Sequence, residues 1–299
     1  MSRALAFGLL LALAMSVTAS AAKRKPRPVR VLEPGALAYD HSRHDVLVAD
    51  RKLHRVVRID LPSGKRRVAV TGLRDIVGLA YDDMARLYVA AGNRIFRVAG
   101  GGKTLIAGNG QRGHTGDGGP ATAASFGGVG GFEVDHDESI VVAEYDNWIR
   151  FIDPNGIVST IAGTGVEGYA GDGGPARAAL LKHPHDLALR AGREVIVADS
   201  HNGALRRIDP AGTITTLATG FASPVAVKGG PGNSLYVADG GANAVFRIPA
   251  GGTAQRVGRA TAPFNLAVDA RHNVYVSELA GSRRVLRLGP GGRVRVLVR

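Results

Sequence analysis

Histidine and carboxylate side chains gather in one short stretch of the sequence, and metal-dependent or acid-base chemistry requires these residue types. His185 and Asp186 are adjacent, and His201 lies just after Asp199. Imidazole nitrogens and carboxylate oxygens are ligands that zinc and other transition ions accept in proteins. The sequence therefore offers His185, Asp186 and His201 as a candidate metal site. The alternative is that these are ordinary exposed histidines in turns.

The same residues belong to a sequence repeat. Each repeat has an apolar strand that ends on a small or acidic residue, then a polar turn and a second strand. The strands stop at Asp50, Ala91, Glu144, Asp199, Asp239 and Glu278. The unit is roughly forty residues long, with extra chain inserted twice, which fits the four short strands of one propeller blade. The sequence therefore predicts an all-β fold, a six-bladed β-propeller with four antiparallel strands per blade.

Turn residues place the four strands of each blade, which we call A to D from the channel outward. In the first blade they are expected near residues 36–39, 46–49, 55–59 and 66–70, with Pro62 to Gly64 turning C into D. Residues 29–32 are left over as a further strand at the start. We expect that strand to lie against the last blade and help to close the ring.

Strand direction decides which candidate residues meet. The D-to-A connections and the B-to-C turns share one face of the ring, and both insertions, 108–120 and 163–175, fall in D-to-A connections. On that face Asn265 is expected to lie across the channel mouth from His185. Tyr145, Trp148 and Tyr169 lie in segments that face the same rim, where they supply ligand contacts or else pack beneath their loops.

Two repeated features have structural explanations beside the functional ones. The acidic residues at the ends of the B strands form a collar for a cation or a basic ligand, or else they bind turn amides and pair with arginines. The glycine-rich insertions lack the lysine of a phosphate-binding loop, and each has one acidic residue, Asp117 or Asp172, in its glycine-rich turn. We expect these aspartates to accept turn amides, and Pro120 and Pro175 to open short helices.

Segments such as 196–202 and 205–209, Ile-Val-Ala-Asp-Ser-His-Asn and Leu-Arg-Arg-Ile-Asp, resemble the NHL-repeat family of six-bladed propellers. The insertions resemble the extended repeats of bacterial NHL proteins and teneurin ectodomains. The resemblance covers about residues 29–299 and implies a family that includes binding scaffolds and a few enzymes.

Two propeller enzyme families provide a further comparison. Gluconolactonase-like propellers hold a divalent ion with a Glu and several Asn or Asp residues. Glu33, Asp186 and Asn265 resemble fragments of that set, whereas 130–131 and 223–224 supply no ligand. Lyase-like propellers hold zinc with histidines from different blades. Here His185 is the histidine at the start of an A strand, and His114 lies on a longer loop.

The start of the chain predicts where the protein is located in or outside the cell. Residues 1–22 have the basic start, apolar run and small residues of a signal peptide, and the apolar run is shorter than the roughly 20 residues that a membrane anchor needs. Residues 23–30 form a flexible basic lead-in, and residues 31–299 form the propeller. The chain has no cysteine. We expect a secreted or periplasmic monomer.

Charge and composition lead to two hypotheses. The net charge is +13 and aromatics make up 5% of the chain; scarce stacking platforms and the predicted export argue against nucleic acid. The first hypothesis is a binding scaffold, without a cofactor, whose insertion-bearing face contacts a protein or an anionic cell-envelope polymer. The alternative is a metal-dependent hydrolase, lactonase or lyase with one Zn or Ca ion at the channel mouth.

Overall fold

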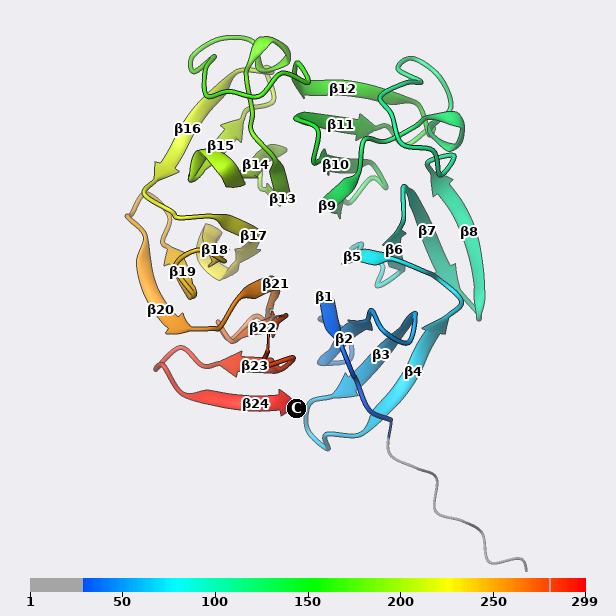
Figure 1. The fold of residues 1–299 in the computed structure, drawn as a ribbon, viewed down its shortest axis with the longest axis vertical. Helices are drawn as coiled ribbons and strands as arrows, with labels where there is room; N and C mark the ends of the chain where they lie inside the picture. Colours follow the sequence, from blue (N-terminus) through cyan, green and yellow to red (C-terminus); the bar gives the residue numbers. More distant parts are fainter. Residues whose placement is uncertain (1–28, 280) are drawn as a thin grey trace, which may run out of the picture.

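The computed structural model describes residues 29–279 and 281–299, and its strands form six four-stranded antiparallel sheets around a central channel (Figure 1). Hydrogen-bonded order follows chain order in every sheet, so each blade is built from four consecutive strands. The predicted fold class is confirmed. The predicted signal peptide, and the lead-in as far as residue 28, lie outside the described residues. Among the described residues, no helix is long and apolar enough to cross a membrane.

The strands have the following bounds, blade by blade: β1 (Pro34–Asp40), β2 (Asp45–Asp50), β3 (Arg55–Asp60), β4 (Arg66–Thr71); β5 (Ile76–Tyr81), β6 (Leu87–Ala91), β7 (Arg94–Ala99), β8 (Gly102–Ala107); β9 (Val129–Val134), β10 (Ile140–Glu144), β11 (Trp148–Ile152), β12 (Val158–Gly163); β13 (Pro184–Arg190), β14 (Glu194–Asp199), β15 (Ala204–Ile208), β16 (Ile214–Thr219); β17 (Pro224–Gly230), β18 (Ser234–Asp239), β19 (Ala244–Ile248), β20 (Gln255–Arg259); β21 (Pro263–Val268), β22 (Val274–Glu278), β23 (Val285–Leu288), β24 (Val294–Val298). Four short 3-10 helices lie between them: η1 (Ala121–Ala123), η2 (Ala176–Ala178), η3 (Ser200–Asn202) and η4 (Pro231–Asn233).

The innermost strand of every blade has a β-bulge near its start. In β13, Pro184 pairs with Asp199 and Asp186 pairs with Ala198, which leaves His185 as the extra residue. Phe264 is the extra residue in β21 in the same way. Because a bulge redirects the side chain that it leaves unpaired, the chain has one special position per blade at this end of the channel.

The acidic residues that end the B strands are structural. Asp50, Glu144, Asp199, Asp239 and Glu278 are buried, and each accepts a backbone N–H from the connection that leads into its own blade. Arg55, Arg150, Arg206 and Arg284 pair with four of them. The structural interpretation of the collar is supported, with one difference. The amides come mainly from the D-to-A connection rather than from the B-to-C turn.

Each insertion folds over the blade that follows it, at the outer edge of the ring (green loops in Figure 1). Asp117 accepts from the Arg150 guanidinium at 2.6 Å and from the Thr160 amide at 3.0 Å. Asp172 repeats the arrangement in the next blade, with Arg206 at 2.7 Å and the Thr216 amide. The short helices η1 and η2 follow Pro120 and Pro175 as predicted. These aspartates therefore anchor the loops.

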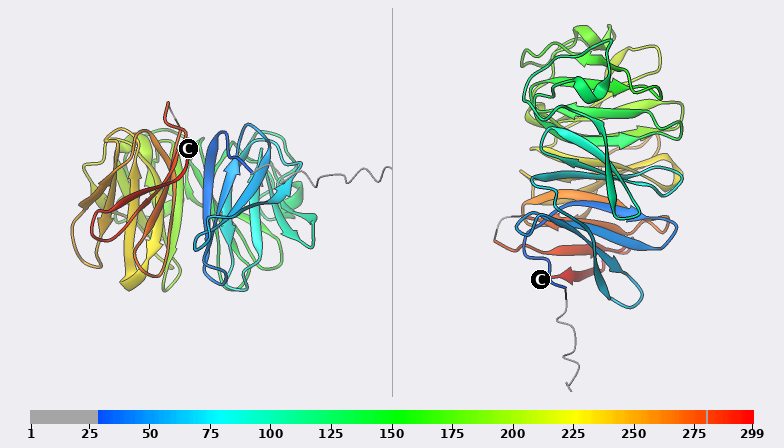
Figure 2. Two further views of the ribbon diagram at one scale, coloured as in Figure 1. Left: turned by 90° about the horizontal axis from the view of Figure 1, so that it is seen from below. Right: turned by 90° about the vertical axis from the view of Figure 1, so that its right-hand side faces the viewer.

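Side-chain packing joins the first and last blades, which lie side by side in Figures 1 and 2. The strand predicted at 29–32 does not form, because the Leu32 and Glu33 amides point to the Asp50 carboxylate. Val31 is nevertheless buried in a cluster that includes Val285 and Val298 of the last blade. The Arg66 guanidinium also donates to the Leu297 carbonyl at 2.8 Å.

Replacing Arg206 by methionine is expected to lower the free energy of unfolding by about 3 kcal/mol, because buried Asp199 then loses its cation. The matched variant Arg207→Met removes an arginine that is 38% exposed and pairs with Glu194, so its cost is below about 1 kcal/mol. Urea unfolding followed by circular dichroism measures both. Equal losses in the two variants would contradict the structural role of Arg206.

Candidate functional site

Aromatic and imidazole rings pack across the channel mouth on the D-to-A face. Tyr145 stacks on His183 with centroids 4.7 Å apart, and His183 stacks on His201 at 4.4 Å. His185 contacts Tyr145 at 5.1 Å and meets the edge of Phe264 at 5.9 Å. We call these five residues the ring cluster. The predicted grouping of Tyr145, His185 and His201 is therefore present, but as stacked rings.

Two features show how tightly the ring cluster is packed. The Arg51 guanidinium lies over the Phe264 ring at 5.5 Å, so residues from four blades meet across this mouth. Gly130 leaves no room for a larger residue, since a β-carbon there would be 2.5 Å from the His185 carbonyl oxygen and 3.0 Å from the Tyr145 ring. Burial, and next the charge on His183, lower the pKa of His185 to about 4. His185 is therefore uncharged near neutral pH.

The other predicted ligands are engaged elsewhere. Asp186 binds Lys228 and the Val227 amide, and Asn265 Oδ1 accepts from the Leu37 amide at 3.0 Å. Glu33 lies 3.9 Å from the Arg51 guanidinium. Within residues 29–279 and 281–299, no group of three or more His, Asp and Glu side chains has a geometry that would hold a metal ion. Glu33, Asp186 and Asn265, which resemble part of the gluconolactonase-like metal site, therefore do not come together as metal ligands.

The remaining predicted contacts belong to the insertions. The Trp148 ring stacks on His114 with centroids 3.8 Å apart, so it packs beneath the first insertion. Tyr169 is half-exposed on the second insertion, where its hydroxyl bonds Thr216 Oγ1 at 2.8 Å and the Arg206 guanidinium covers its ring. Tyr169 is thus fixed in position and still available at the surface, whereas Trp148 has the packing role.

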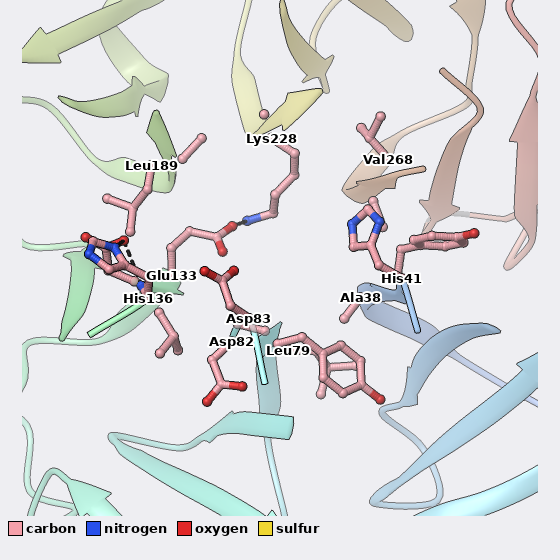
Figure 3. Close-up of a pocket in the computed structure, with 18 of the residues that line it drawn as sticks. Ala38, His41, Leu79, Asp82, Asp83, Glu133, His136, Leu189, Lys228 and Val268 are labelled. Atoms are coloured by element: carbon pink, nitrogen blue, oxygen red, sulfur yellow. Dashed lines mark hydrogen bonds and ion pairs between the residues drawn. The ribbon is translucent and has the colours of Figure 1, made fainter. Parts of the chain in front are cut away.

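A cavity of about 820 Å³ occupies the other end of the channel, where the innermost strands finish (Figure 3). All six blades line this axial cavity, through the second halves of the A strands and the A-to-B turns. The sequence pattern favoured the opposite face, because the two insertions are there. A cavity of this volume is in the range of small-molecule sites.

The fifth residue of each innermost strand explains why the axial cavity is open. Ala38, Ala80, Ala188 and Ala267 occupy this position in four blades, and all four line the cavity. Glu133 and Lys228 occupy it in the third and fifth blades. Neither was predicted as a site residue. The signal for them is present in the sequence, because they are the two charged residues at a position that is otherwise alanine.

Lys228 and two carboxylates form an ion cluster that borders the cavity. The Lys228 ammonium donates to Glu133 Oε1 at 2.6 Å, Asp186 Oδ1 at 3.2 Å and the Leu187 carbonyl at 3.4 Å, which uses its three N–H groups. The side chains of Glu133 and Lys228 are 21% and 15% exposed, and Asp186 is buried. Figure 3 shows Glu133 and Lys228 pointing toward one another. No described residue bonds the second oxygen of Glu133.

Burial sets the protonation of this cluster. It raises the pKa of Glu133 and of Asp186, and Lys228 partly opposes the rise in both. Burial also disfavours the charge on Lys228, but Asp186 and Glu133 outweigh it and hold the pKa of the lysine above its usual value. Lys228 is therefore an ammonium ion, and Glu133 is a carboxylate whose proton affinity is increased.

An aspartate–histidine pair lies at the rim of the same cavity. Asp135 Oδ1 is 2.7 Å from His136 Nδ1, and this hydrogen bond, with the charge of Asp135, raises the pKa of His136. A carboxylate on Nδ1 fixes the proton there, so Nε2 is the ring nitrogen left for other partners. Asp83 and His41 also line the cavity and are drawn in Figure 3.

No family model matches the sequence, and no curated protein matches it. Among solved structures, a streptogramin B lyase has a TM-score of 0.62 at 14% identity over 91% of this chain and 84% of that chain. A gluconolactonase of Xanthomonas campestris has a TM-score of 0.65 at 14% identity over 84% of each chain. A calcium-binding regucalcin of Agrobacterium tumefaciens has a TM-score of 0.59 at 13% identity, covering 85% and 84%.

At these identities the likeness establishes the six-bladed propeller fold alone. The neighbours are lactonase-like and lyase propellers rather than NHL-repeat proteins in particular. The predicted propeller is confirmed by this comparison, and the narrower resemblance to NHL repeats stays a prediction.

Acid is expected to weaken the fold through His185. Between pH about 6.5 and 4 the unfolded chain binds a proton that native His185 does not. As the pH is lowered through this range, His185 therefore reduces the free energy of unfolding by about 2 to 4 kcal/mol. The variant His185→Phe keeps a ring and should lack this part of the loss in urea unfolding at pH 7 and pH 4. His136→Gln, at the rim, should retain it. If His185→Phe lost as much stability between pH 7 and pH 4 as the native chain does, His185 would not be the source of the acid sensitivity.

Proposed function

We propose that the chain is a hydrolase or lyase that acts on a small polar molecule in the axial cavity, as a lactone-opening enzyme. The observation that carries the proposal is the Glu133–Lys228 ion pair, which faces the cavity where the other four blades have alanine. A charged pair half-enclosed in a channel is costly to desolvate, and such groups are frequent at functional sites. The lactonase and lyase folds of the structural neighbours support the same class.

The residues of the cavity suggest separate roles. Glu133 has a free carboxylate oxygen and a raised pKa, which suit a general base that takes a proton from water. Lys228 is a positioning residue, because it fixes the orientation of Glu133 and limits its pKa. The raised pKa of His136 favours its imidazolium form, and in that form Nε2 can donate to a carbonyl oxygen as that oxygen becomes negative.

A lactone would react in two steps. Water adds to the carbonyl carbon as Glu133 accepts its proton, which forms a C–O bond and a negative oxygen. The ring C–O bond then breaks, and the leaving oxygen takes the proton from Glu133, so the products are a hydroxy acid and the free base. Glu33, Asp186 and Asn265 do not fit a divalent ion here, so these steps use side chains of the chain alone.

Glu133→Gln is expected to lower kcat/KM for lactone hydrolysis by about 10²-fold or more, because the amide cannot accept the proton. Acid release from a panel of five- and six-membered lactones, followed at constant pH, measures it. Glu167→Gln, an exposed glutamate on the second insertion, is the matched control and should leave the rate unchanged.

Lys228→Met tests the positioning role through pH. Lys228 lowers the pKa of Glu133, so its loss should move the acid limb of the pH–rate profile to higher pH. No turnover across the whole panel, or equal rates for Glu133→Gln and the native chain, would overturn the proposed function.

A second candidate is an interaction scaffold on the D-to-A face, and one observation favours it. Val166 and Tyr169 are 61% and 50% exposed on an insertion that Asp172 anchors. Because the chain has a net charge of +13, we propose an anionic cell-envelope polymer as the partner.

Polyphosphate is a suitable probe for the scaffold, measured by titration calorimetry at low and high salt. The double variant Val166→Ser, Tyr169→Ser is expected to weaken binding about threefold or more. Binding that depends on salt alone and is equal in both proteins would contradict a specific surface at this insertion.

A further inference from the structure

A second pocket, of about 490 Å³, lies between the third and fourth blades. Its walls are mostly apolar and come from both blades and from η2: Val141, Phe151, Ile161, Leu189, Val195, Ile208, Pro175 and Ala176. The C-to-D turn of the fourth blade, 209–212, forms part of its border. This interblade pocket shares Asp135, Leu189 and Arg193 with the axial cavity.

Because its walls are apolar, the interblade pocket is suited to the apolar part of a ligand. Phe151, Ile161 and Leu189 pack against the buried cluster of these two blades and still keep part of their surface exposed. Covering such surface stabilises a complex by roughly 25 cal/mol per Å² before the cost of association. The pocket volume is within the range of sites for small molecules.

The charged side chains around the interblade pocket have polar partners, with one exception in the described part of the chain. Arg193 donates to Asp137 at 2.5 Å and lies 4.0 Å from Asp135. Asp209 accepts the Thr213 amide at 2.9 Å within its own turn. Arg177 is exposed, and no hydrogen bond or ion pair joins it to another described residue.

Arg177 also breaks the repeat between the two insertions. Both insertions contain Gly-Asp-Gly-Gly-Pro-Ala, then one variable residue, then Ala-Ala. The variable residue is Thr122 in the first insertion and Arg177 in the second, and both occupy the middle of a short helix. The anchoring of the loop is the same in both, so it does not require an arginine at this place.

We propose that the interblade pocket binds a small carboxylic acid with an apolar chain or ring. The apolar body lies between the two blades, and the carboxylate meets the Arg177 guanidinium at the rim. An arginine presents paired N–H groups that match a carboxylate, and this contact gives the pocket its preference for an acid over an alcohol.

Octanoate and 1-octanol are the probes, because they share the chain and differ in charge. Titration calorimetry of the full chain is expected to show tighter binding of octanoate. Arg177→Gln should weaken octanoate about two- to fivefold, the range for an exposed charge pair, and leave octanol unchanged. Arg112→Gln, an exposed arginine of the first insertion, is the matched control and should change neither.

Ala211→Trp tests the pocket itself, since Ala211 is exposed in the turn that borders it. The indole should abolish binding of both probes while the unfolding temperature and any lactone hydrolysis stay native, which separates this site from the axial cavity. Three results would overturn the proposal: equal affinities for the two probes, octanoate binding that survives Ala211→Trp, or the same loss in Arg112→Gln as in Arg177→Gln.

Discussion

The fold depends on one repeated interaction, the hydrogen bond from the chain entering a blade to the buried carboxylate that ends the second strand of that blade. Asp239, for example, accepts from the Ala222 and Ser223 amides at 2.8 and 2.9 Å. In five blades the bond fixes where the innermost strand begins, and the bulge that follows then sets which residue turns toward the channel. In the second blade Ala91 replaces the acid. What remains there is the backbone bond from the Gly92 amide to the Asp75 carbonyl, which the first blade also makes between Arg51 and Glu33.

Burying these carboxylates is costly unless each is paired and hydrogen-bonded. The third and fourth blades meet this need with Arg150 and Arg206, which are themselves buried and reach outward to the aspartates of the insertions. The loops are thereby part of the charge balance of the blades. This explains why two long glycine-rich connections have the same anchoring residues although they differ at exposed positions.

The sequence was sufficient to predict the ring, because the pattern of strand and turn occurs six times and the strand ends on an acidic residue in five of them. The site could be predicted only in part. His185 and His201 are close in the sequence and lie in one cluster, but periodicity carries no information on ring orientation: His201 stacks on His183, and His185 is tilted against the same ring. Glu133 and Lys228 are 95 residues apart and meet only because blades three and five flank blade four, whose Asp186 also bonds Lys228. Their signal appears when the fifth residues of the inner strands are aligned, rather than the first.

Each innermost strand contributes to both ends of the channel. In β13 the second residue, His185, lies at the bulge among the packed rings, and the fifth residue, Ala188, lines the axial cavity. The two ends can therefore be altered separately, because one substitution changes one end and leaves the contacts of the other end in place.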